Sequence, residues 1–184
     1  MDKNTNTEII FFASGCFWCT EAVFKRVKGV EEILPGYIGG SIKNPAYREV
    51  CTGRTGHAEC IKIEYDPSII KLEVLLAVNF STHDPTTLNR QGYDVGTQYR
   101  SGIYYTTEAQ KEMIEEYLSY LEREKIFEQS IVTEVKEAET FYTAEEEHHD
   151  YYDQNADQRY CELVIAPKIA KLRASYVDYL KPNS

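Results

Sequence analysis

One cysteine of this chain stands where a strand is expected to end and a helix to begin. Residues 8–13 (EIIFFA) are typical of a buried strand, Gly15 breaks that strand, and residues 16–27 carry helical spacing. Cys16 is therefore predicted at the first turn of the helix. The free backbone N–H groups there and the positive end of the helix dipole favour a thiolate, so we expect a lowered pKa for Cys16. The alternative is a small buried core residue, which this position makes the weaker interpretation.

Two aromatic residues, Phe17 and Trp18, follow this cysteine directly. Bulky aromatic side chains at the start of a helix commonly fill the core. Beside a reactive thiol they could instead form the wall of a pocket for an apolar group such as an S-methyl group. The residues alone leave both interpretations open.

A carboxyl group is predicted among apolar side chains on a later strand. Alternation over residues 58–66 places Glu59 on the same face as Ile61, Ile63 and Tyr65. Burial there would raise the pKa of the carboxyl and keep part of it protonated at neutral pH, as a general acid requires. The alternative is that Glu59, in the first turn of the strand, reaches solvent.

Two tyrosines and an aspartate complete the set of candidate residues. Tyr47 precedes Glu59 in a loop, Tyr99 follows a glycine-rich stretch, and both could donate an O–H group to a developing oxyanion. Asp94 lies in that glycine-rich stretch, where stabilising a turn is the default role of an aspartate. Most of the 15 tyrosines are expected to be amphipathic packing residues.

The cysteines are odd in number and too sparse for a disulfide scaffold. There are five: Cys16, Cys19, Cys51, Cys60 and Cys161. Cys19 lies one helical turn from Cys16, close enough in principle for a short-loop disulfide. Cys51 and Cys60 are interpreted as buried structural thiols.

Two other kinds of protein could also use the first cysteine pair. A zinc module would join Cys16 and Cys19 to His57 and Cys60, but both pairs would then have to leave the predicted helix start and strand. A general disulfide oxidoreductase would use the first pair alone, but the chain lacks the βαβ start of a thioredoxin fold.

The adjacent histidines His148 and His149 invite a metal interpretation as well. Neighbouring residues of a helix point about 100° apart, so a solvated helix face is the favoured interpretation. We expect no metal and no cofactor in the site.

The elements that must position these residues follow the order βαββαβ. After the first strand and helix we expect strands over residues 30–40 and 58–66, joined by a polar loop over 41–56. A helix should follow Asp66-Pro67, and a fourth strand should cover residues 98–105. This succession predicts an α+β fold, a two-layer sandwich with a ferredoxin-like core.

A helical elaboration is expected at the C-terminal end. Capping boxes predict helix starts at Thr107 with Gln110 and at Thr143 with Glu146. A strand over residues 131–135 should lie between those two helices. A last helix is expected over residues 166–180.

Length and charge limit the classes of function. The 184 residues are expected to form one domain over 1–184. A net charge of −10 disfavours nucleic acid and anionic lipid as partners. Residues 1–7 are polar with a single lysine, and no run approaches the roughly 18 apolar residues of a membrane span, so we expect a cytoplasmic monomer.

Seven segments of the chain, taken in order, resemble the peptide methionine sulfoxide reductase A family over nearly its whole length. They are GCFWCTE (15–21), GYIGG (36–40), NPAYREVCTGRTGHAE (44–59), YDP (65–67), HDPTTLNRQGYDVGTQYRSGIYY (83–105), FYTAEEEHHDYY (141–152) and RYC (159–161).

The resemblance implies reduction of the S epimer of methionine sulfoxide, free or in proteins, with recycling by thioredoxin or a similar dithiol. Cys16 matches the family nucleophile, which becomes a sulfenic acid. Phe17 and Trp18 match the residues that embrace the sulfoxide methyl group. Glu59 matches the acid that protonates the sulfoxide oxygen.

The remaining family positions are also present. Tyr47 and Tyr99 match the hydrogen-bond partners of the sulfoxide oxygen, and Asp94 matches a residue that contacts the substrate main chain. Cys161 aligns with the resolving cysteine, which forms a disulfide with the nucleophile. Many members have glycine where this chain has Cys19, so Cys19 remains a second candidate for that role, with Cys161 slightly preferred.

Overall fold

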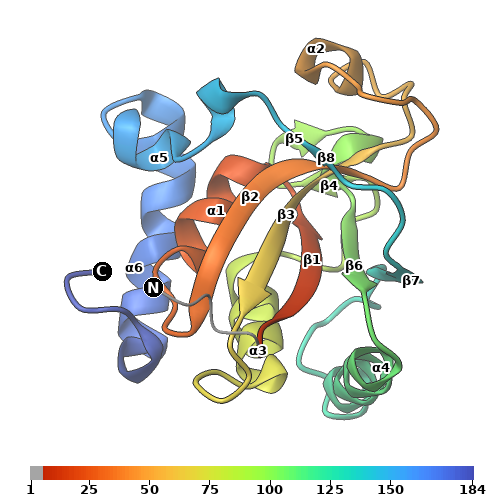
Figure 1. Cartoon of the computed structure of the whole chain (residues 1–184). Coiled ribbons are helices and arrows are strands. Elements are labelled where there is room, and N and C mark those ends of the chain that lie inside the picture. The colour runs from red at the N-terminus through yellow and green to blue at the C-terminus, as the bar shows by residue number, and fades with distance from the viewer. Residues whose placement is uncertain (1–5) are drawn as a thin grey trace.

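Six strands form one sheet in the computed structural model, which describes residues 6–184. The order across the sheet is β7-β6-β1-β3-β2-β8, and every neighbouring pair is antiparallel except β6 and β7 (Figure 1). The strands are β1 (Glu8–Ser14), β2 (Val30–Ile38), β3 (Ala58–Tyr65), β6 (Ser101–Tyr105), β7 (Glu134–Glu137) and β8 (Tyr142–Thr143). The molecule is therefore a mixed α+β fold around a central sheet.

An α-helix follows each of the strands β1, β2, β3 and β6, and two more lie near the end of the chain. The α-helices are α1 (Phe17–Phe24), α2 (Tyr47–Val50), α3 (Leu72–Thr82), α4 (Glu108–Arg123), α5 (Tyr151–Gln154) and α6 (Ala166–Ser175). A short hairpin of β4 (Arg90–Gln91) and β5 (Asp94–Val95) precedes the 3-10 turn Thr97–Tyr99. Figure 1 shows α1 and α6 side by side on one side of the sheet.

Strand alternation divides the core into two parts. Ile61 and Ile63 of β3 lie in the main cluster with residues of α1, α3 and α4, whereas Ala58 and Cys60 belong to a smaller cluster on the opposite face. The alternation predicted for β3 is therefore confirmed. Each fully buried aliphatic side chain stabilises the fold by roughly 1.5–3 kcal/mol, so the helix-covered face contributes most of the hydrophobic stabilisation.

The second face of the sheet is covered by the segment between β7 and β8. The rings of Phe141 and Phe11 lie 5.2 Å apart, centroid to centroid. A Cβ atom on Gly36 would lie 2.4 Å from both the Phe141 ring and the Tyr142 carbonyl oxygen. Only glycine at this position of β2 lets the covering segment approach closely enough to pair as β8.

Helix α1 is buried almost all round, because the sheet covers one side and α6 the other. Seven of its eight residues are buried, among them Cys19 and Glu21. A helix with so little exposed surface can hold polar groups only where other residues provide hydrogen bonds. This explains why reactive groups gather around its N-terminal end.

Several predicted elements differ from the observed ones at their ends. The strand expected over residues 98–105 starts only at Ser101, because Thr97–Tyr99 forms a 3-10 turn. The strand expected over 131–135 lies at Glu134–Glu137, since the Ile131 amide donates instead to the side chain of Glu122. The loop expected over 41–56 contains the short helix α2.

Two predictions near the C-terminus are corrected. Thr143 starts no helix: it pairs with Gly36 as part of β8, and a 3-10 turn, Glu146–His148, follows. The predicted last helix begins early, as a π-helical segment over Cys161–Ile165, and α6 ends at Ser175. The helix stops there because the following residues return to the end of α1, where Lys28 donates to the Tyr179 carbonyl.

Thr107 does cap a helix as predicted, since its side chain accepts from the Gln110 amide at the start of α4. The polar segment noted over residues 1–7 falls mostly outside the described residues. Among residues 6–184, no helix has both the length and the apolar character that a membrane crossing requires.

Candidate active site

Cys16 stands in the turn between β1 and α1, as the residue that caps the helix. Its carbonyl oxygen accepts from the amides of Cys19 and Thr20 at 3.1 and 3.4 Å. The preceding Gly15 has a φ of +93°, and a Cβ there would lie 2.6 Å from the side chain of Gln91. Glycine is therefore needed both for the backbone conformation and for the close approach of the β4–β5 hairpin.

Three cysteines meet in one cluster at the N-terminal end of α1. Cys16, Cys19 and Cys161 pack together with Ile165 and Ile169 of the C-terminal helical segment. Cys16 is 7% exposed, Cys19 3% and Cys161 not at all. The structure thus brings the predicted nucleophile together with both candidates for the resolving thiol.

The predicted acidification of Cys16 is wrong for this resting arrangement. Burial raises the pKa of the Cys16 thiol, and its hydrogen bond to Cys19 raises it further. A hydrogen bond from the Trp18 amide acts in the opposite direction but is weaker than these two causes. The helix start is present as expected, but burial outweighs its effect.

The pKa of the Cys19 thiol is shifted in the opposite direction. The hydrogen bond from Cys16 lowers the pKa of Cys19, burial opposes that shift, and the positive charge of Lys168 again favours the thiolate. The Tyr160 hydroxyl lies 3.6 Å from the Cys19 sulfur. Cys16 is thus the proton-bearing member of a hydrogen-bonded pair of thiols.

Asp94 reaches this pair through a tyrosine. Its carboxylate accepts from the Tyr160 hydroxyl at 2.7 Å. The expected role of Asp94 in stabilising a turn is therefore wrong. Asp94 lies in β5, and its hydrogen-bond partner Tyr160 is 66 positions away in the sequence. Tyr160 was missed in the sequence because a tyrosine among 15 carries no signal of its own.

Glu59 is almost completely buried and faces the start of α1. One carboxyl oxygen, Oε1, accepts from the Phe17 amide at 3.3 Å, while Oε2 has no hydrogen-bond partner among the described residues. Burial raises the pKa of this carboxyl to about 8, against the opposing effect of the Phe17 amide. The predicted burial of Glu59 is confirmed, and with this pKa the carboxyl is mostly protonated at neutral pH.

Tyr47 and Tyr99 lie half-buried around the same point. Burial and the neighbouring Glu59 raise the pKa of both hydroxyl groups, so both keep their protons. Tyr99 packs against the cysteine cluster from the 3-10 turn before β6. Tyr47, at the start of α2, lies over the aromatic rings next to Cys16.

Phe17 and Trp18 belong to an aromatic cluster with Tyr47, His148 and Tyr151. Phe17 is fully buried, and its ring lies 6.2 Å from that of Tyr47 and 5.5 Å from that of His148. The indole of Trp18 stacks on Tyr151 at 3.8 Å, with the planes inclined by only 7°. Phe17 therefore fills core and at the same time supports the rings beside the thiol.

His148 is the main site residue that the sequence did not suggest. It is 5% exposed, and its Nδ1 accepts from the Trp18 indole N–H at 3.2 Å. The predicted solvated face is wrong because a 3-10 turn, not a helix, directs His148 inward while His149 bonds to the Ala144 carbonyl. A signal did exist: a partly buried indole N–H needs an acceptor, and the chain has one tryptophan.

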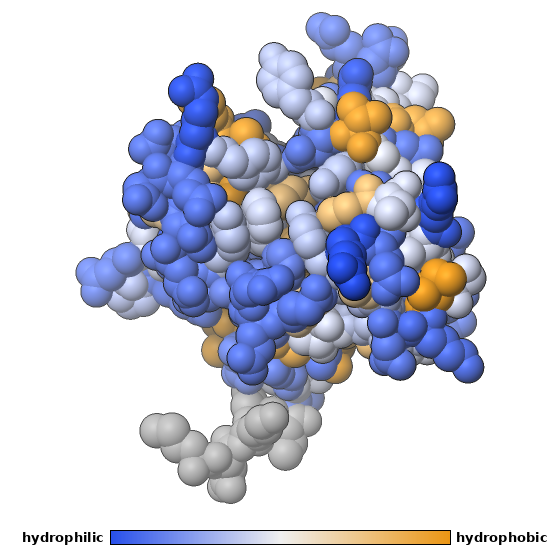
Figure 2. Space-filling view, turned by 90° about the horizontal axis from the view of Figure 1, so that it is seen from above, coloured by the Kyte–Doolittle hydropathy of each residue, from blue (hydrophilic) through white to orange (hydrophobic). Residues whose placement is uncertain are grey.

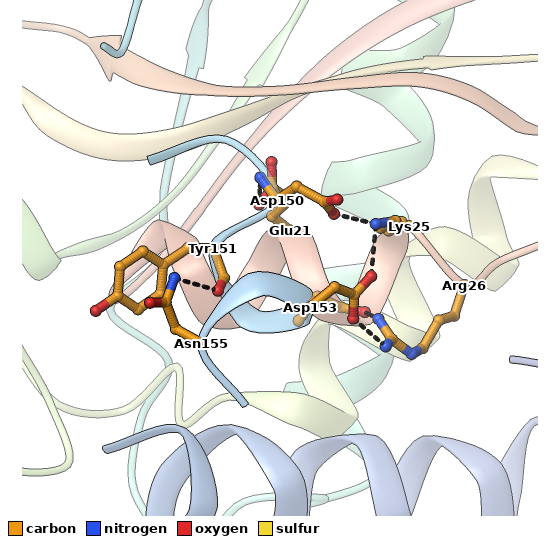
Figure 3. Close-up of polar contacts among 8 residues, drawn as sticks. Glu21, Lys25, Arg26, Asp150, Tyr151, Asp153 and Asn155 are labelled. Atoms are coloured by element: carbon orange, nitrogen blue, oxygen red, sulfur yellow. Dashed lines mark hydrogen bonds and ion pairs between the residues drawn. The ribbon is translucent and has the colours of Figure 1, made fainter. Parts of the chain in front are cut away.

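Helix α5, which supplies Tyr151, is fastened to α1 by polar contacts (Figure 3). The buried carboxylate of Glu21 accepts from the Asp150 amide at 2.8 Å, and burial raises its pKa to about 7. Lys25 pairs with Asp150 and Asp153, and Arg26 also pairs with Asp153. These contacts hold the ring of Tyr151 over Trp18.

The remaining cysteines differ from each other. Cys60 is buried in the second core cluster, as expected of a structural thiol. Cys51 is exposed, which contradicts the expectation of burial, because it follows α2 at the surface. Burial raises the pKa of its thiol, and the nearby Tyr47 hydroxyl offsets part of that shift.

The zinc alternative is not supported by the placement of its four residues. Cys60 points to the opposite face of β3 from Glu59, whereas Cys16 and Cys19 lie on the helix-covered face. Both ring nitrogens of His57 already have partners, the Gly40 amide and the Ile42 carbonyl. In residues 6–184 only Glu145, Glu147 and His148 bring possible metal ligands within 4.8 Å of one another.

A cavity of about 110 Å³ reaches the thiol pair from the surface. Cys16, Cys19, Asp94, Tyr160 and Lys168 contribute to its lining. Figure 2 looks onto the end of the molecule where α2, α5 and the β4–β5 hairpin lie, and it shows orange residues in small patches among hydrophilic ones. Exposed apolar side chains scattered in this way are ordinary for a protein surface.

Residues 8–180 match the profile of a family described as peptide methionine sulfoxide reductase. The chain belongs to the peptide methionine sulfoxide reductase family. Relatives named peptide methionine sulfoxide reductase MsrA include one from Deinococcus radiodurans, 51% identical over 95% of this chain and 84% of its own length. Another, from Sulfolobus acidocaldarius, is 52% identical over 93% of this chain and 96% of its own length.

Two solved structures share the fold. Mxr1 from Saccharomyces cerevisiae in reduced form has a TM-score of 0.79 at 31% identity, covering 88% of this chain and 92% of its own. Methionine sulfoxide reductase A of Corynebacterium diphtheriae has a TM-score of 0.73 at 36% identity, covering 83% and 76%.

The contact between Trp18 and His148 predicts a fluorescence change in acid. Neutral His148 accepts at Nδ1, so a proton there would set two donors against each other and break the bond. Burial lowers the pKa of His148. The charges of Glu145 and Glu147 raise this pKa and so offset part of the shift, whereas His149 lowers it further. Tryptophan emission, which Trp18 alone provides, should therefore change with a midpoint below the ordinary value of about 6.5.

His148→Phe, which keeps a ring but removes the acceptor, should abolish this transition and cost about 1 kcal/mol of unfolding free energy. His149→Phe is the matched control and should keep the transition. If the fluorescence transition persisted in His148→Phe and was lost in His149→Phe, the assignment of this transition to His148 would be wrong.

Proposed function

We propose that this chain reduces the S epimer of methionine sulfoxide, free or within proteins, and so repairs oxidised methionine. The observation that supports this most directly is the protonated carboxyl of Glu59, which accepts from the amide of Phe17 directly after Cys16 at the start of α1. A sulfoxide has an electrophilic sulfur and an oxygen that leaves badly, so reduction needs both a nucleophile and a proton donor.

Cys16 attacks the sulfoxide sulfur as a thiolate. In the resting site the Cys16 thiol donates a hydrogen bond to Cys19. Transfer of its proton to Cys19 therefore produces the Cys16 thiolate without a proton acceptor from solvent. Glu59 gives its proton to the sulfoxide oxygen. Collapse of this adduct moves the hydroxyl from the substrate sulfur to the Cys16 sulfur. The substrate sulfur–oxygen bond and the new sulfur–sulfur bond break, a sulfur–oxygen bond forms on Cys16, and methionine leaves while Cys16 becomes a sulfenic acid.

The remaining residues bind and orient the substrate. The protonated hydroxyls of Tyr47 and Tyr99 donate to the oxygen as it gains charge. Phe17 and Trp18 hold the methyl group, and Asp94 contacts the substrate main chain. The support is their common location around Cys16, with Asp94 on the wall of the cavity that leads to it.

A second thiol then closes the cycle. Cys161 was slightly preferred from the sequence, but the hydrogen bond between Cys16 and Cys19 favours Cys19 for the first step. Cys161, in the same cluster, then exchanges with the Cys16–Cys19 disulfide and releases Cys16 as a thiol. A thioredoxin-like dithiol reduces the final disulfide; the related Mxr1 has been solved in complex with Trx2.

Two structural classifications are proposed with this function. The central strands β6-β1-β3-β2, with α1 after β1 and α3 after β3, have the order of a ferredoxin-like core. The whole chain is proposed as one domain, because β7 and β8 from its second half complete the sheet begun by β1.

The decisive activity test uses a methionine sulfoxide peptide and a dithiol reductant. The protein should release methionine from the S epimer, and Cys16→Ser should lower the rate by at least about 10³-fold because the nucleophile is lost. Cys60→Ser, which removes a thiol on the other face of the sheet, should keep the activity. A Cys16→Ser protein with normal turnover would overturn the proposal.

The pH dependence of methionine release should report the buried acid. Glu59 must be protonated to act, so the single-turnover rate should hold below its pKa of about 8 and fall as the pH rises through that value. Glu59→Gln cannot donate an acid proton and should be about 10²–10⁴-fold slower. The Glu59→Gln variant should also lose the fall in rate at alkaline pH. If that fall is unchanged in the variant, the titration belongs to another group.

The resolving step can be assigned by thiol counting and disulfide mapping after one turnover. Cys161→Ser should release methionine and stop at a Cys16–Cys19 disulfide. Cys19→Ser should release one methionine per chain and keep the sulfenic acid, which a dimedone probe would trap. Rapid formation of a Cys16–Cys161 disulfide in Cys19→Ser would restore Cys161 as the first resolving thiol.

A further inference from the structure

Lys168 of α6 occupies a place that the proposed mechanism has not used. Its ammonium group donates to the Thr82 carbonyl at 2.6 Å, at the C-terminal end of α3. The side chain is half-buried, because α6 packs against both α1 and α3. A helix C-terminus attracts positive charge, so the ammonium is held at this point rather than free in solvent.

The same lysine lines both small cavities that Cys19 lines. One is the cavity of about 110 Å³ that also contains Cys16 and Asp94. The other, of about 10 Å³, lies between Cys19, Thr82 and His83 and has room for about one water molecule. Little solvent can therefore screen the charge of Lys168 from the thiol.

The other charges around Cys19 cannot replace this cation. Asp94 and Glu59 are acidic, and the thiols of Cys16 and Cys161 and the hydroxyl of Tyr160 are neutral or negative. Burial lowers the pKa of His83 to about 4, so that ring is uncharged at neutral pH. Lys168 is the only lysine or arginine that lines either cavity in the described part of the chain.

We propose that Lys168 is a positioning residue that keeps the negative charge of the thiol pair on Cys19 and so prepares Cys19 to attack oxidised Cys16. The inference rests on the resolving step of the proposed function. The thiolate of Cys19 attacks the sulfenic sulfur of Cys16 and a sulfur–sulfur bond forms. The hydroxyl leaves as water with the proton that Cys19 earlier took from Cys16, so Cys19 is oxidised and Cys16 reduced with no further reactant.

The charge of Lys168 supports this assignment in the resting protein as well. The hydrogen bond from Cys16 is the largest cause of the lowered pKa of Cys19, burial opposes it, and Lys168 is the next cause that favours the thiolate. Once Cys16 has become a sulfenic acid, that first hydrogen bond is altered. The lysine then remains as the fixed positive charge beside the attacking sulfur.

The test compares Lys168→Met and Lys168→Arg with the matched control Lys171→Met. Lys171 lies on the same helix as Lys168, and both residues line an open groove on the surface. Lys171 is exposed, however, and lines neither of the two small cavities. Thiolate ultraviolet absorbance of the reduced protein is titrated, and the Cys19 component is the one missing in Cys19→Ser. Single-turnover methionine release and disulfide formation are then measured separately.

In Lys168→Met the Cys19 titration should move to higher pH. Disulfide formation at neutral pH should be about tenfold slower, because a rise of about one pKa unit lowers the thiolate fraction about tenfold. Methionine should still be released in one equivalent per chain. Lys168→Arg should restore most of the titration, and Lys171→Met should match the wild type.

Equal Cys19 titrations in Lys168→Met, Lys171→Met and the wild type would overturn the inference. So would a Lys168→Arg protein as impaired as Lys168→Met, since that points to a packing role for the lysine. If the wild type itself released no methionine, the proposed function would fail, while the titration would still decide the role of Lys168.

Discussion

The contact between the Glu59 carboxyl and the Phe17 amide fixes the geometry of the whole site. It joins the first turn of α1 to the middle of the sheet, 42 residues away in sequence, at 3.3 Å. A carboxyl group on β3 can reach that amide only because β1 and β3 are neighbours and α1 crosses directly over them. The cysteine before Phe17 and the acid on β3 are therefore set opposite each other by the same packing that builds the core.

Burial then decides where protons and charge lie. A low-dielectric site disfavours charge on every group in it, and Cys16, Glu59, Tyr47 and Tyr99 all keep their protons. Cys19 is the exception, because the Cys16 thiol, the charge of Lys168 and the Tyr160 hydroxyl lower its pKa against the effect of burial. The site is thus rich in protons beside a thiol whose pKa is lowered, which suits a reaction that must protonate a poor leaving oxygen.

Local signals in the sequence predicted the parts of this arrangement that depend on near neighbours. Strand alternation placed Glu59 on the apolar face, with solvent exposure as the alternative that its burial now excludes, and Gly15 predicted the end of β1 before Cys16. The sign of the Cys16 shift could not be predicted, because it depends on the residues that cover α1 from α6. His148 was misassigned for the same kind of reason, since a 3-10 turn and the indole of Trp18 override its apparent helical pattern.

The C-terminal segment is consequently part of the site and more than a cover for it. It supplies Tyr160 and Cys161 to the thiol cluster, and α6 supplies Lys168. The chain passes from Tyr160 into α6 through the π-helical segment Cys161–Ile165, whose wider turn alters which side chains face α1. A disulfide between Cys19 and Cys161 would join the two helical segments covalently at this point. Forming that disulfide would therefore act on the packing of α6 against α1, next to Tyr160, whose hydroxyl donates to Asp94 on the wall of the cavity.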